Sequence, residues 1–347
     1  MDAVRDGRVE RLGRAGLRSV DVSSPAGSSQ GPIPVVMDVD TGIDDALALL
    51  VAVRSAEIDL VGVGTVSGNV SASVAARNTL RVLEVAGADS VPVAVGADRP
   101  LMEPPHEATW VHGRDGLGDS GQPQPQGAPS DEHAVDQLLR LSVEHAGELV
   151  VVAVGPLTNV AIALARDPSL AGRLARIVLM GGSARSGGNR SAWAEANIAC
   201  DPEAAEIVFG CSVPRTMVGL DVTMQVRLDE ADAQALAEQH DDVARFAAQI
   251  LPFYLDAYAS WTGERRCAVH DPLAVAVVAH PGLVTTYPLP TRVELHGSQT
   301  RGMTVVDLRA LMRVDPAVDV VTTDVALEVD VQAARDFVLG RLSGAAD

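Results

Sequence analysis

Four aspartates within eight residues constrain how this chain folds more than any other feature of the sequence. They are Asp38, Asp40, Asp44 and Asp45. The residues before them, Ile33 to Met37, have the length and β-branched content of a buried strand, and Ala46 to Val51 continue as an apolar helix. The acids therefore lie at the carboxyl end of a strand, where open parallel α/β sheets bind ligands. Gly42 permits a tight turn there.

This acidic turn, residues 38–45, predicts a metal site. Four carboxylates in one turn repel one another unless a cation lies between them, and hard oxygen ligands suit calcium or magnesium. Two plainer interpretations compete: Asp44 or Asp45 only caps the following helix, or the acids form a solvated run of charge. A cap accounts for one acid but not for four, so we expect a bound cation.

The rest of the chain alternates strands and helices in the rhythm of a right-handed parallel sheet. Strands are expected at residues 58–66, 91–95, 149–154, 177–180 and 213–218. Helices are expected at residues 71–86, 132–146, 229–262 and 273–279, and a further helix should run from the turn at 155–159 to residue 165. The C-terminal part is expected to be strand-rich, at residues 291–295, 302–308 and 318–329, before a closing helix to about 342. The predicted fold class is α/β, an open, mostly parallel sheet with a Rossmann-like core and helices on both faces.

The composition of the N-terminal segment predicts the domain boundary. Residues 1–31 are charged at first and then rich in Ser, Gly and Pro, so we expect a disordered tail there. Residues 32–347 are expected to form a single α/β domain, because a hydrophobic fraction of 47% supplies a sizeable core.

Charge and residue usage exclude several classes of function. A net charge of −19 without a basic patch argues against nucleic-acid and anionic-membrane partners. Every basic residue is an arginine, which excludes a lysine Schiff base or phosphate-loop lysine. Cys200, Cys211 and Cys267 are odd in number and lack metal-finger spacing, so they predict reduced thiols in a cytoplasmic protein. No apolar run has membrane-spanning length, and no signal peptide is evident.

Three further segments carry polar side chains that are candidates for a site. Within the long loop 98–131, His112 stands beside glycines, a pattern compatible with a mobile flap and with a plain cluster of turns. Glu195 and Asn197 are two residues apart and would point the same way in an extended segment. His270 and Asp271 precede a proline at a helix start, which points both side chains toward whatever faces that helix end.

Several motifs, in this order, resemble the inosine-uridine preferring nucleoside hydrolase family. They are Asp-x-Asp-x-Gly-x-Asp-Asp at 38–45, Gly68-Asn69, Gly-Pro-Leu-Thr-Asn at 155–159, Met-Gly-Gly at 180–182, Gly188-Asn189 with Ala-Glu-x-Asn at 194–197, and His-Asp-Pro at 270–272. The resemblance covers residue 34 to the C-terminus. Two positions depart from it: Thr41 replaces a usual proline, and Ala196 replaces a common aromatic, which is expected to alter the pocket near the ribose 5′ end.

The resemblance implies a ligand set for calcium and for a ribonucleoside. Calcium would be bound by Asp40, Asp45, Asp271 and a backbone carbonyl, that of Val154. The ribose 2′ and 3′ hydroxyls would contact Asp44, Asn69 and Asn197. The 5′ hydroxyl would contact Asn189 and Glu195, with Met180 packed beneath the sugar. Asp38 would support the ligands from behind.

The resemblance also implies a reaction, the hydrolysis of the N-glycosidic bond to ribose and free base through a ribosyl cation. Asp40 would take a proton from the water that calcium holds as this water attacks C1′, and His270 would protonate the leaving base. His112 would close over the base. We further expect a cytoplasmic homo-oligomer, a dimer or tetramer.

Two other functions compete with this one. A haloacid-dehalogenase-like phosphatase also begins with Asp-x-Asp after a strand, but it needs a Lys or Arg clamp and a later acidic pair, whereas the pair follows here at once and lysine is absent. A non-catalytic calcium-dependent nucleoside-binding protein would have no use for both Asp40 and His270.

The sequence also bears on the leaving base. Aromatic residues make up 3% of the chain, and its tryptophans are Trp110, Trp193 and Trp261, a sparse supply for an aromatic purine pocket. His112 and His270 are placed around the base by the resemblance, and a histidine suits the carbonyl oxygen of a pyrimidine. We therefore expect a pyrimidine or broad base preference.

Overall fold

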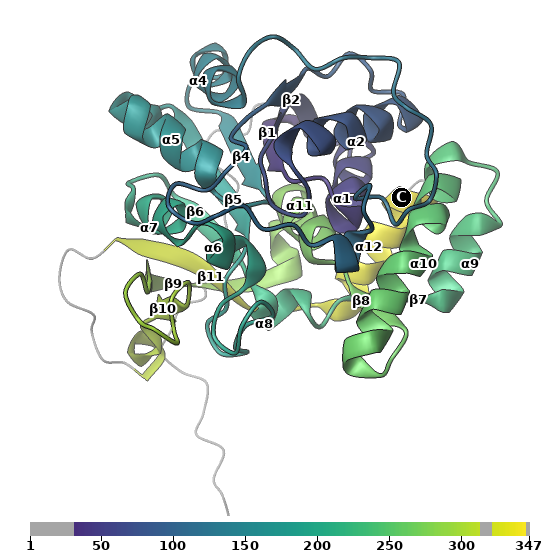
Figure 1. The fold of residues 1–347 in the computed structure, drawn as a ribbon. Coiled ribbons are helices and arrows are strands. Elements are labelled where there is room, and N and C mark those ends of the chain that lie inside the picture. The colour runs from purple at the N-terminus through teal and green to yellow at the C-terminus, as the bar shows by residue number, and fades with distance from the viewer. Residues whose placement is uncertain (1–30, 313–320, 345–347) are drawn as a thin grey trace, which may run out of the picture.

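A nine-stranded sheet forms the centre of the computed structural model, which describes residues 31–312 and 321–344 (Figure 1). Its strands, in spatial order, are β10 (Thr304–Val306), β9 (Val284–Val293), β11 (Thr322–Val329), β6 (Arg215–Val218), β5 (Leu174–Met180), β4 (Leu149–Ala153), β1 (Ile33–Val39), β2 (Ile58–Thr65) and β3 (Val93–Val95). From β11 to β3 every neighbouring pair is parallel, and β9 runs antiparallel to β11 and β10. The predicted mostly parallel α/β sheet is confirmed. The predicted tail lies outside the described residues except for Gly31.

Each central strand is buried on both faces. In β4, Val150 and Val152 contribute to one hydrophobic core, and Leu149 and Val151 contribute to the other. This alternation follows from the period of two along a strand. A continuous run of apolar residues is therefore what a strand between two helix layers needs.

Helices cover both faces of the sheet, as predicted (Figure 1). One core includes α1 (Ile43–Val53), α2 (Ala72–Val85), α9 (Glu230–Ala237), α10 (Asp242–Thr262), α11 (His270–Ala279) and α12 (Val331–Ser343). The other includes α4 (Ala134–Glu144), α5 (Thr158–Arg166) and α7 (Pro202–Gly210). Shorter helices are α3 (Thr109–His112), α6 (Ala196–Cys200), α8 (Leu220–Thr223) and the 3₁₀ segments Pro168–Gly172, Pro281–Leu283 and Leu308–Met312.

The path of the chain through the sheet creates a crevice at the end of β1. From β1 the chain moves outward through β2 to β3, and then returns to the opposite side of β1 with β4. Strand order thus reverses between β1 and β4. Doubly wound sheets bind their ligands outside the carboxyl ends of the strands at such a point. The acidic turn directly follows β1 and therefore lies there.

Two local predictions were wrong in detail, and one small sheet was missed. The helix expected over 229–262 is divided into α9 and α10, because the Asp241 side chain accepts from the Ala244 amide and caps a new helix. The strand expected at 291–295 is the end of β9, which begins at Val284. A small antiparallel sheet of β7 (Arg227–Asp229) and β8 (Arg266–Ala268) was not predicted, because these strands are too short to show periodicity.

Helix lengths and hydropathy also bear on a membrane. Among the residues that the structure describes, no helix combines the length and the apolar character needed to cross a bilayer.

Helix α1 carries the acidic turn at its amino end, and its burial generates a prediction about stability. It packs against α11, α2, α10 and α12, and every residue from Ile43 to Ala52 is buried. Leu50→Ala should lower the free energy of unfolding by about 2–5 kcal/mol, because the cavity left in a rigid core does not collapse. Urea titration measures this. Leu101→Ala, at a position 36% exposed, is the matched control and should cost less than about 1 kcal/mol. Equal losses would show that α1 is not part of the rigid core.

Candidate functional site

The acidic turn is held closed by its own backbone. The Asp45 carboxylate accepts hydrogen bonds from the backbone amides of Asp40 (3.1 Å) and Gly42 (2.9 Å). It also accepts from the side-chain amide of Asn69 at 3.1 Å. Asp45 therefore does cap the start of α1, one of the plainer interpretations of the turn. The cap accounts for this one acid and leaves the others to be explained.

Asp40 is fixed by the segment that follows β2. Its Oδ2 accepts from the backbone amide of Asn69 at 2.6 Å. A Cβ at Gly68 would lie 2.0 Å from the same oxygen, so only glycine allows this close approach. The other oxygen, Oδ1, is buried and has no hydrogen-bond partner among the described residues. One oxygen of Asp40 is thus anchored, and the second is available for chemistry.

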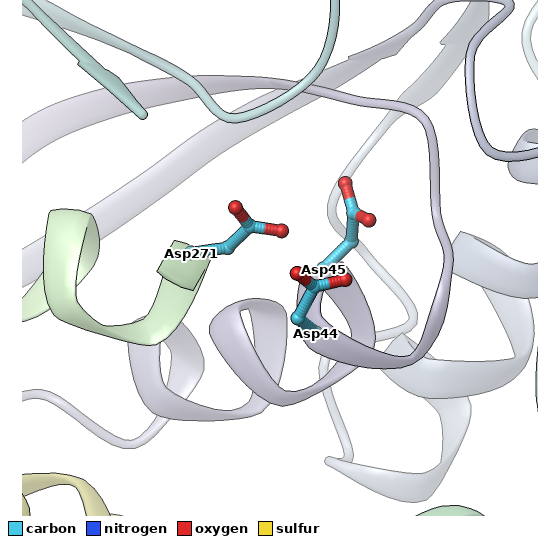
Figure 2. Close-up of side chains that lie close together, drawn as sticks. All are labelled: Asp44, Asp45 and Asp271. Atoms are coloured by element: carbon cyan, nitrogen blue, oxygen red, sulfur yellow. The ribbon is translucent and has the colours of Figure 1, made fainter. Parts of the chain in front are cut away.

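Asp44, Asp45 and Asp271 converge from two helix amino ends (Figure 2). One carboxylate oxygen from each lies within 4.8 Å of the other two, and all three residues are buried. The predicted metal ligands included Asp40 and not Asp44, which was assigned to the ribose. Asp40 adjoins the group through its backbone bond to Asp45. The structure therefore brings four carboxylates to one place, from residues up to 231 positions apart (Asp40 to Asp271).

The electrostatics of this cluster fit a cation. Burial, followed by repulsion from Asp44, raises the pKa of Asp45 to about 7. Burial and the neighbouring aspartates also raise the pKa values of Asp40 and Asp271 well above the ordinary range. Asp40 Oδ1 and Asp44 Oδ1 are buried and accept no hydrogen bond from any described residue, although His112 Nδ1 lies 3.7 Å from Asp44 Oδ1. A divalent cation would satisfy these oxygens and offset the repulsion, and an all-oxygen donor set suits calcium or magnesium.

Asp38 begins the acidic turn and is held by a side-chain amide. Its Oδ1 accepts from the Asn159 side-chain amide at 2.8 Å, and that amide also donates to the Thr65 carbonyl. Burial raises the pKa of Asp38 to about 7. Asp38 therefore links the acidic turn to the Gly-Pro-Leu-Thr-Asn turn at the start of α5.

The carbonyl of Val154, predicted as a metal ligand, lies at the end of β4. It accepts from the Asn197 side-chain amide at 2.7 Å, and Asn197 also donates to the Met180 carbonyl. A carbonyl oxygen has two lone pairs, so this bond leaves one for a cation. Val154, Met180 and Asn197 thus form one connected wall beside the acids.

Glu195 and Asn197 do not lie in an extended segment. Residues Ala196–Cys200 form α6, and Glu195 caps this helix by accepting from the amides of Asn197 and Ile198. Glu195 also accepts from the Gly182 amide, and Asn189 accepts from the Ala196 amide. Capping, which the two-residue spacing did not reveal, brings these side chains to the same cavity.

A single cavity collects almost all predicted site residues. It encloses about 860 Å³ when the open solvent at its mouth is counted. Of the predicted residues, the following line it: Asp40, Asp44, Asn69, His112, Val154, Met180, Asn189, Glu195, Asn197, His270 and Asp271. Asp45 lies behind this lining, fully buried.

His112 is a buried part of the site. It ends α3, and its Nδ1 accepts from the backbone amide of Ile43 at 3.0 Å. A Cβ at Gly42 would lie 2.5 Å from this nitrogen, so the glycine allows the contact. Because a backbone N–H can only donate, Nδ1 is unprotonated and the neutral ring carries its proton on Nε2. His112 therefore offers the cavity a hydrogen-bond donor.

His270 is hydrogen-bonded through both ring nitrogens, and a second tyrosine of α10 is hydrogen-bonded to one of the acids. The His270 Nε2 is 2.6 Å from the Tyr258 hydroxyl, and its Nδ1 is 2.7 Å from that of Thr223. The Tyr254 hydroxyl donates to Asp44 at 3.1 Å. Burial lowers the pKa of His270 to about 4, with Asp44 opposing the shift. The imidazole thus faces the cavity in company with Tyr258.

An aromatic wall, not predicted from the sequence, lines the mouth of the cavity. It consists of Tyr254, Tyr258 and Trp261 of α10 and Trp110 of α3. The two indoles lie 4.6 Å apart between ring centroids, and both are about half exposed. The chain has few aromatic residues, but several of these few are gathered at one place. Their spacing of four and three residues on one helix was the available signal.

Comparison with known proteins gives a family match. The model of a family described as inosine-uridine preferring nucleoside hydrolase matches residues 35–336. A probable uridine nucleosidase 2 from Arabidopsis thaliana is 37% identical, over 89% of this chain and 97% of that protein. An inosine-uridine preferring nucleoside hydrolase from Crithidia fasciculata is 38% identical, over 91% and 99%. The solved structure of a purine-preferring ribonucleoside hydrolase from Gardnerella vaginalis is similar with a TM-score of 0.84 and 36% identity, over 90% and 98%.

The carboxylate cluster predicts that a divalent cation stabilises the fold. After exhaustive chelation the melting temperature should fall, and added calcium should restore it with a dependence on concentration, because the cation binds only the folded state. Asp271→Asn should remove most of this response. Asp307→Asn, at a half-buried position whose carboxylate pairs with Arg309 and does not line the cavity, should keep it. A chelated protein whose melting temperature ignores calcium would contradict the metal site.

Proposed function

The chain belongs to the inosine-uridine preferring nucleoside hydrolase family and is a hydrolase of the N-glycosidic bonds of ribonucleosides; we propose that it depends on calcium, uses Asp40 as its base and accepts pyrimidine and purine nucleosides. The observation that carries the proposal is the convergence of buried carboxylates on one cavity, with an unpartnered oxygen of Asp40 among them. The products are ribose and free base.

Calcium is the proposed cation. Asp40, Asp45, Asp271 and the Val154 carbonyl would hold it, with Asp44 as a further oxygen close by. When bound, it would supply positive charge that offsets the carboxylates, anchors vicinal hydroxyls and makes a nearby water more acidic. The donor set supports this choice, because six to eight oxygens are needed and carboxylates, a carbonyl and sugar hydroxyls are all available.

Asp40 is the proposed general base. Its Oδ2 accepts a hydrogen bond from the Asn69 amide, whereas Oδ1 is buried and has no hydrogen-bond partner in the part of the chain that the structure describes. A water would give a proton to Oδ1 while its oxygen forms a bond to C1′. The C1′–N bond breaks, and its electron pair leaves with the base. The positive charge that develops on the ribosyl group is favoured by the surrounding carboxylates.

The ribose would be held by polar groups on either side of Met180. Asp44, Asn69 and Asn197 are proposed to bind its 2′ and 3′ hydroxyls, since they line the cavity next to the acids. Asn189 and Glu195 are proposed to bind the 5′ hydroxyl. Ala196 lines this same end, and its small side chain leaves room beside the 5′ carbon.

The leaving base would be contacted by both histidines and by the aromatic wall. His270 is hydrogen-bonded to the Tyr258 hydroxyl, so we assign donation to the base to this pair and not to the imidazole alone. His112 adds an Nε2–H donor. These donors suit a pyrimidine carbonyl, and the aromatic rings suit stacking on either kind of base. Together they favour a broad preference over a strict one.

The competing functions are weighed against the family match. The match to the nucleoside hydrolase family over residues 35–336 argues against the phosphatase alternative. A non-catalytic nucleoside-binding protein differs from the proposal only in turnover, and an activity assay separates the two.

Location and assembly complete the proposal. The three cysteines form no disulfide, which supports a cytoplasmic protein, and we propose a homodimer or homotetramer from the family resemblance. The partner of the site is a small ribonucleoside and not a nucleic acid, in keeping with a net charge of −19.

Asp40→Asn should lower kcat by about a thousandfold or more while leaving the melting temperature of the calcium form within a few degrees, because an amide cannot take the water's proton. Release of uracil from uridine measures the rate. Asp59→Asn, an exposed aspartate on β2, is the control and should keep wild-type activity. An Asp40→Asn rate within about tenfold of wild type would assign the base to another residue.

Substrate comparison tests the sugar and base contacts. Uridine and inosine should differ by less than about tenfold in kcat/KM, whereas 2′-deoxyuridine should be about a hundredfold worse than uridine, because it leaves buried polar groups unpaired. Free base and free ribose are measured for each. Inosine exceeding uridine by more than about tenfold would refute the broad preference, and a deoxynucleoside equal to uridine would refute the hydroxyl contacts.

A further inference from the structure

The His270 imidazole is fixed by hydrogen bonds at both ring nitrogens. Nδ1 lies 2.7 Å from the Thr223 hydroxyl oxygen, and Nε2 lies 2.6 Å from the Tyr258 hydroxyl oxygen. The three residues come from three elements, because His270 begins α11, Thr223 ends α8 and Tyr258 lies on α10. All three are buried. The ring therefore cannot turn without breaking one of these bonds.

The single proton of the Thr223 hydroxyl decides which ring nitrogen is protonated. Thr223 has no exposed surface, and among the described residues its hydroxyl contacts no hydrogen-bond partner other than His270 Nδ1. If Nδ1–H donated to the hydroxyl oxygen, the hydroxyl proton would be buried without an acceptor, which is costly. If the hydroxyl donates to Nδ1, its proton is satisfied. The second arrangement is therefore favoured.

We propose that Thr223 is a positioning residue for the reaction, whose hydroxyl donates to His270 Nδ1 and so keeps the ring proton on Nε2. An Nε2–H group can only donate, so the Tyr258 hydroxyl oxygen accepts from it. The Tyr258 hydroxyl then does not donate its proton to His270, so this proton can be donated to an acceptor in the cavity. Tyr258 and His270 both line this cavity. In the reaction that acceptor is the departing base.

Loss of the Thr223 hydroxyl removes the hydrogen bond that selects this arrangement. With no donor at Nδ1, the neutral ring can carry its proton there, and Nε2 then accepts the proton of the Tyr258 hydroxyl. The donor that faces the base is withdrawn, although every group that lines the cavity is still present. This inference rests on the proposed function and extends it to a residue that does not line the cavity.

The tautomer can be observed directly by ¹⁵N NMR of the full-length calcium-loaded protein labelled at histidine. The His270 signals are identified by their loss in His270→Gln. In wild type, Nε2 should give the signal of a protonated nitrogen and Nδ1 that of an unprotonated acceptor, and Thr223→Val should move both toward the other tautomer. A protonated Nδ1 in wild type overturns the proposal, whether or not the protein hydrolyses nucleosides.

Kinetics then separates positioning from a structural role. Thr223→Val should lower kcat on uridine and inosine by about 30-fold or more, but stay within about threefold on 4-nitrophenyl β-D-ribofuranoside, whose phenolate leaves without protonation. Thr223→Ser keeps the hydroxyl and should stay within about threefold on all substrates. Thr286→Val is the matched control and should leave all rates unchanged, because it removes a buried hydroxyl of β9 that has no hydrogen-bond partner among the described residues.

The pattern of losses decides the outcome. Equal losses on the nucleosides and on the nitrophenyl riboside would show that Thr223 is only structural, and no loss on either would show that it has no role. Both results overturn the proposal. A wild-type protein that hydrolyses none of these substrates would refute the proposed function, whereas the NMR signals of His270 would still test the hydrogen bond from Thr223.

Discussion

The structure depends on burying several carboxylates beside one another at the end of β1. Asp40, Asp44, Asp45 and Asp271 lie together with little exposure, and burial and mutual repulsion raise the pKa values of three of them. Such a group is stable only if positive charge or protons compensate it. The surrounding chain offsets part of the cost of burial with hydrogen bonds. A backbone amide donates to Asp40, three donors bind Asp45, and a tyrosine hydroxyl donates to Asp44.

The topology of the sheet explains how distant residues reach this point. Parallel strands end at the same edge, and the reversal of strand order between β1 and β4 leaves a crevice there. The segments after β1, β2, β4 and β5 each turn at this edge and contribute one part of the cavity. Helices α3 and α10 add the aromatic wall, and α11 adds His270. Turns and helix ends thus carry the polar side chains of the site, and the strands position these turns.

Much of this arrangement was predictable from the sequence. The apolar strands and the acidic turn indicated the sheet and the place of the site, because a strand covered on both faces must be continuously apolar. The resemblance then assigned residues that the structure brings to one cavity. Asp45 caps α1 and also belongs to the carboxylate cluster. The sequence could not show that it has both roles, because capping and metal binding need the same side chain at the same position.

The base end of the cavity was the part that could not be predicted. Tyr254, Tyr258 and Trp261 share a face of α10, but helical spacing does not tell whether that face meets the core or a cavity. Thr223 gave no signal in the sequence, because a threonine at the end of a four-residue helix is recognised only through the ring that it contacts.

The most direct test of the account is a crystal structure with calcium and ribose, in which anomalous scattering locates the calcium. The account predicts one calcium contacted by Asp40, Asp45, Asp271 and the Val154 carbonyl, with the ribose 2′ and 3′ hydroxyls beside it. A calcium bound elsewhere, or a cluster that stays empty at saturating calcium, would contradict it.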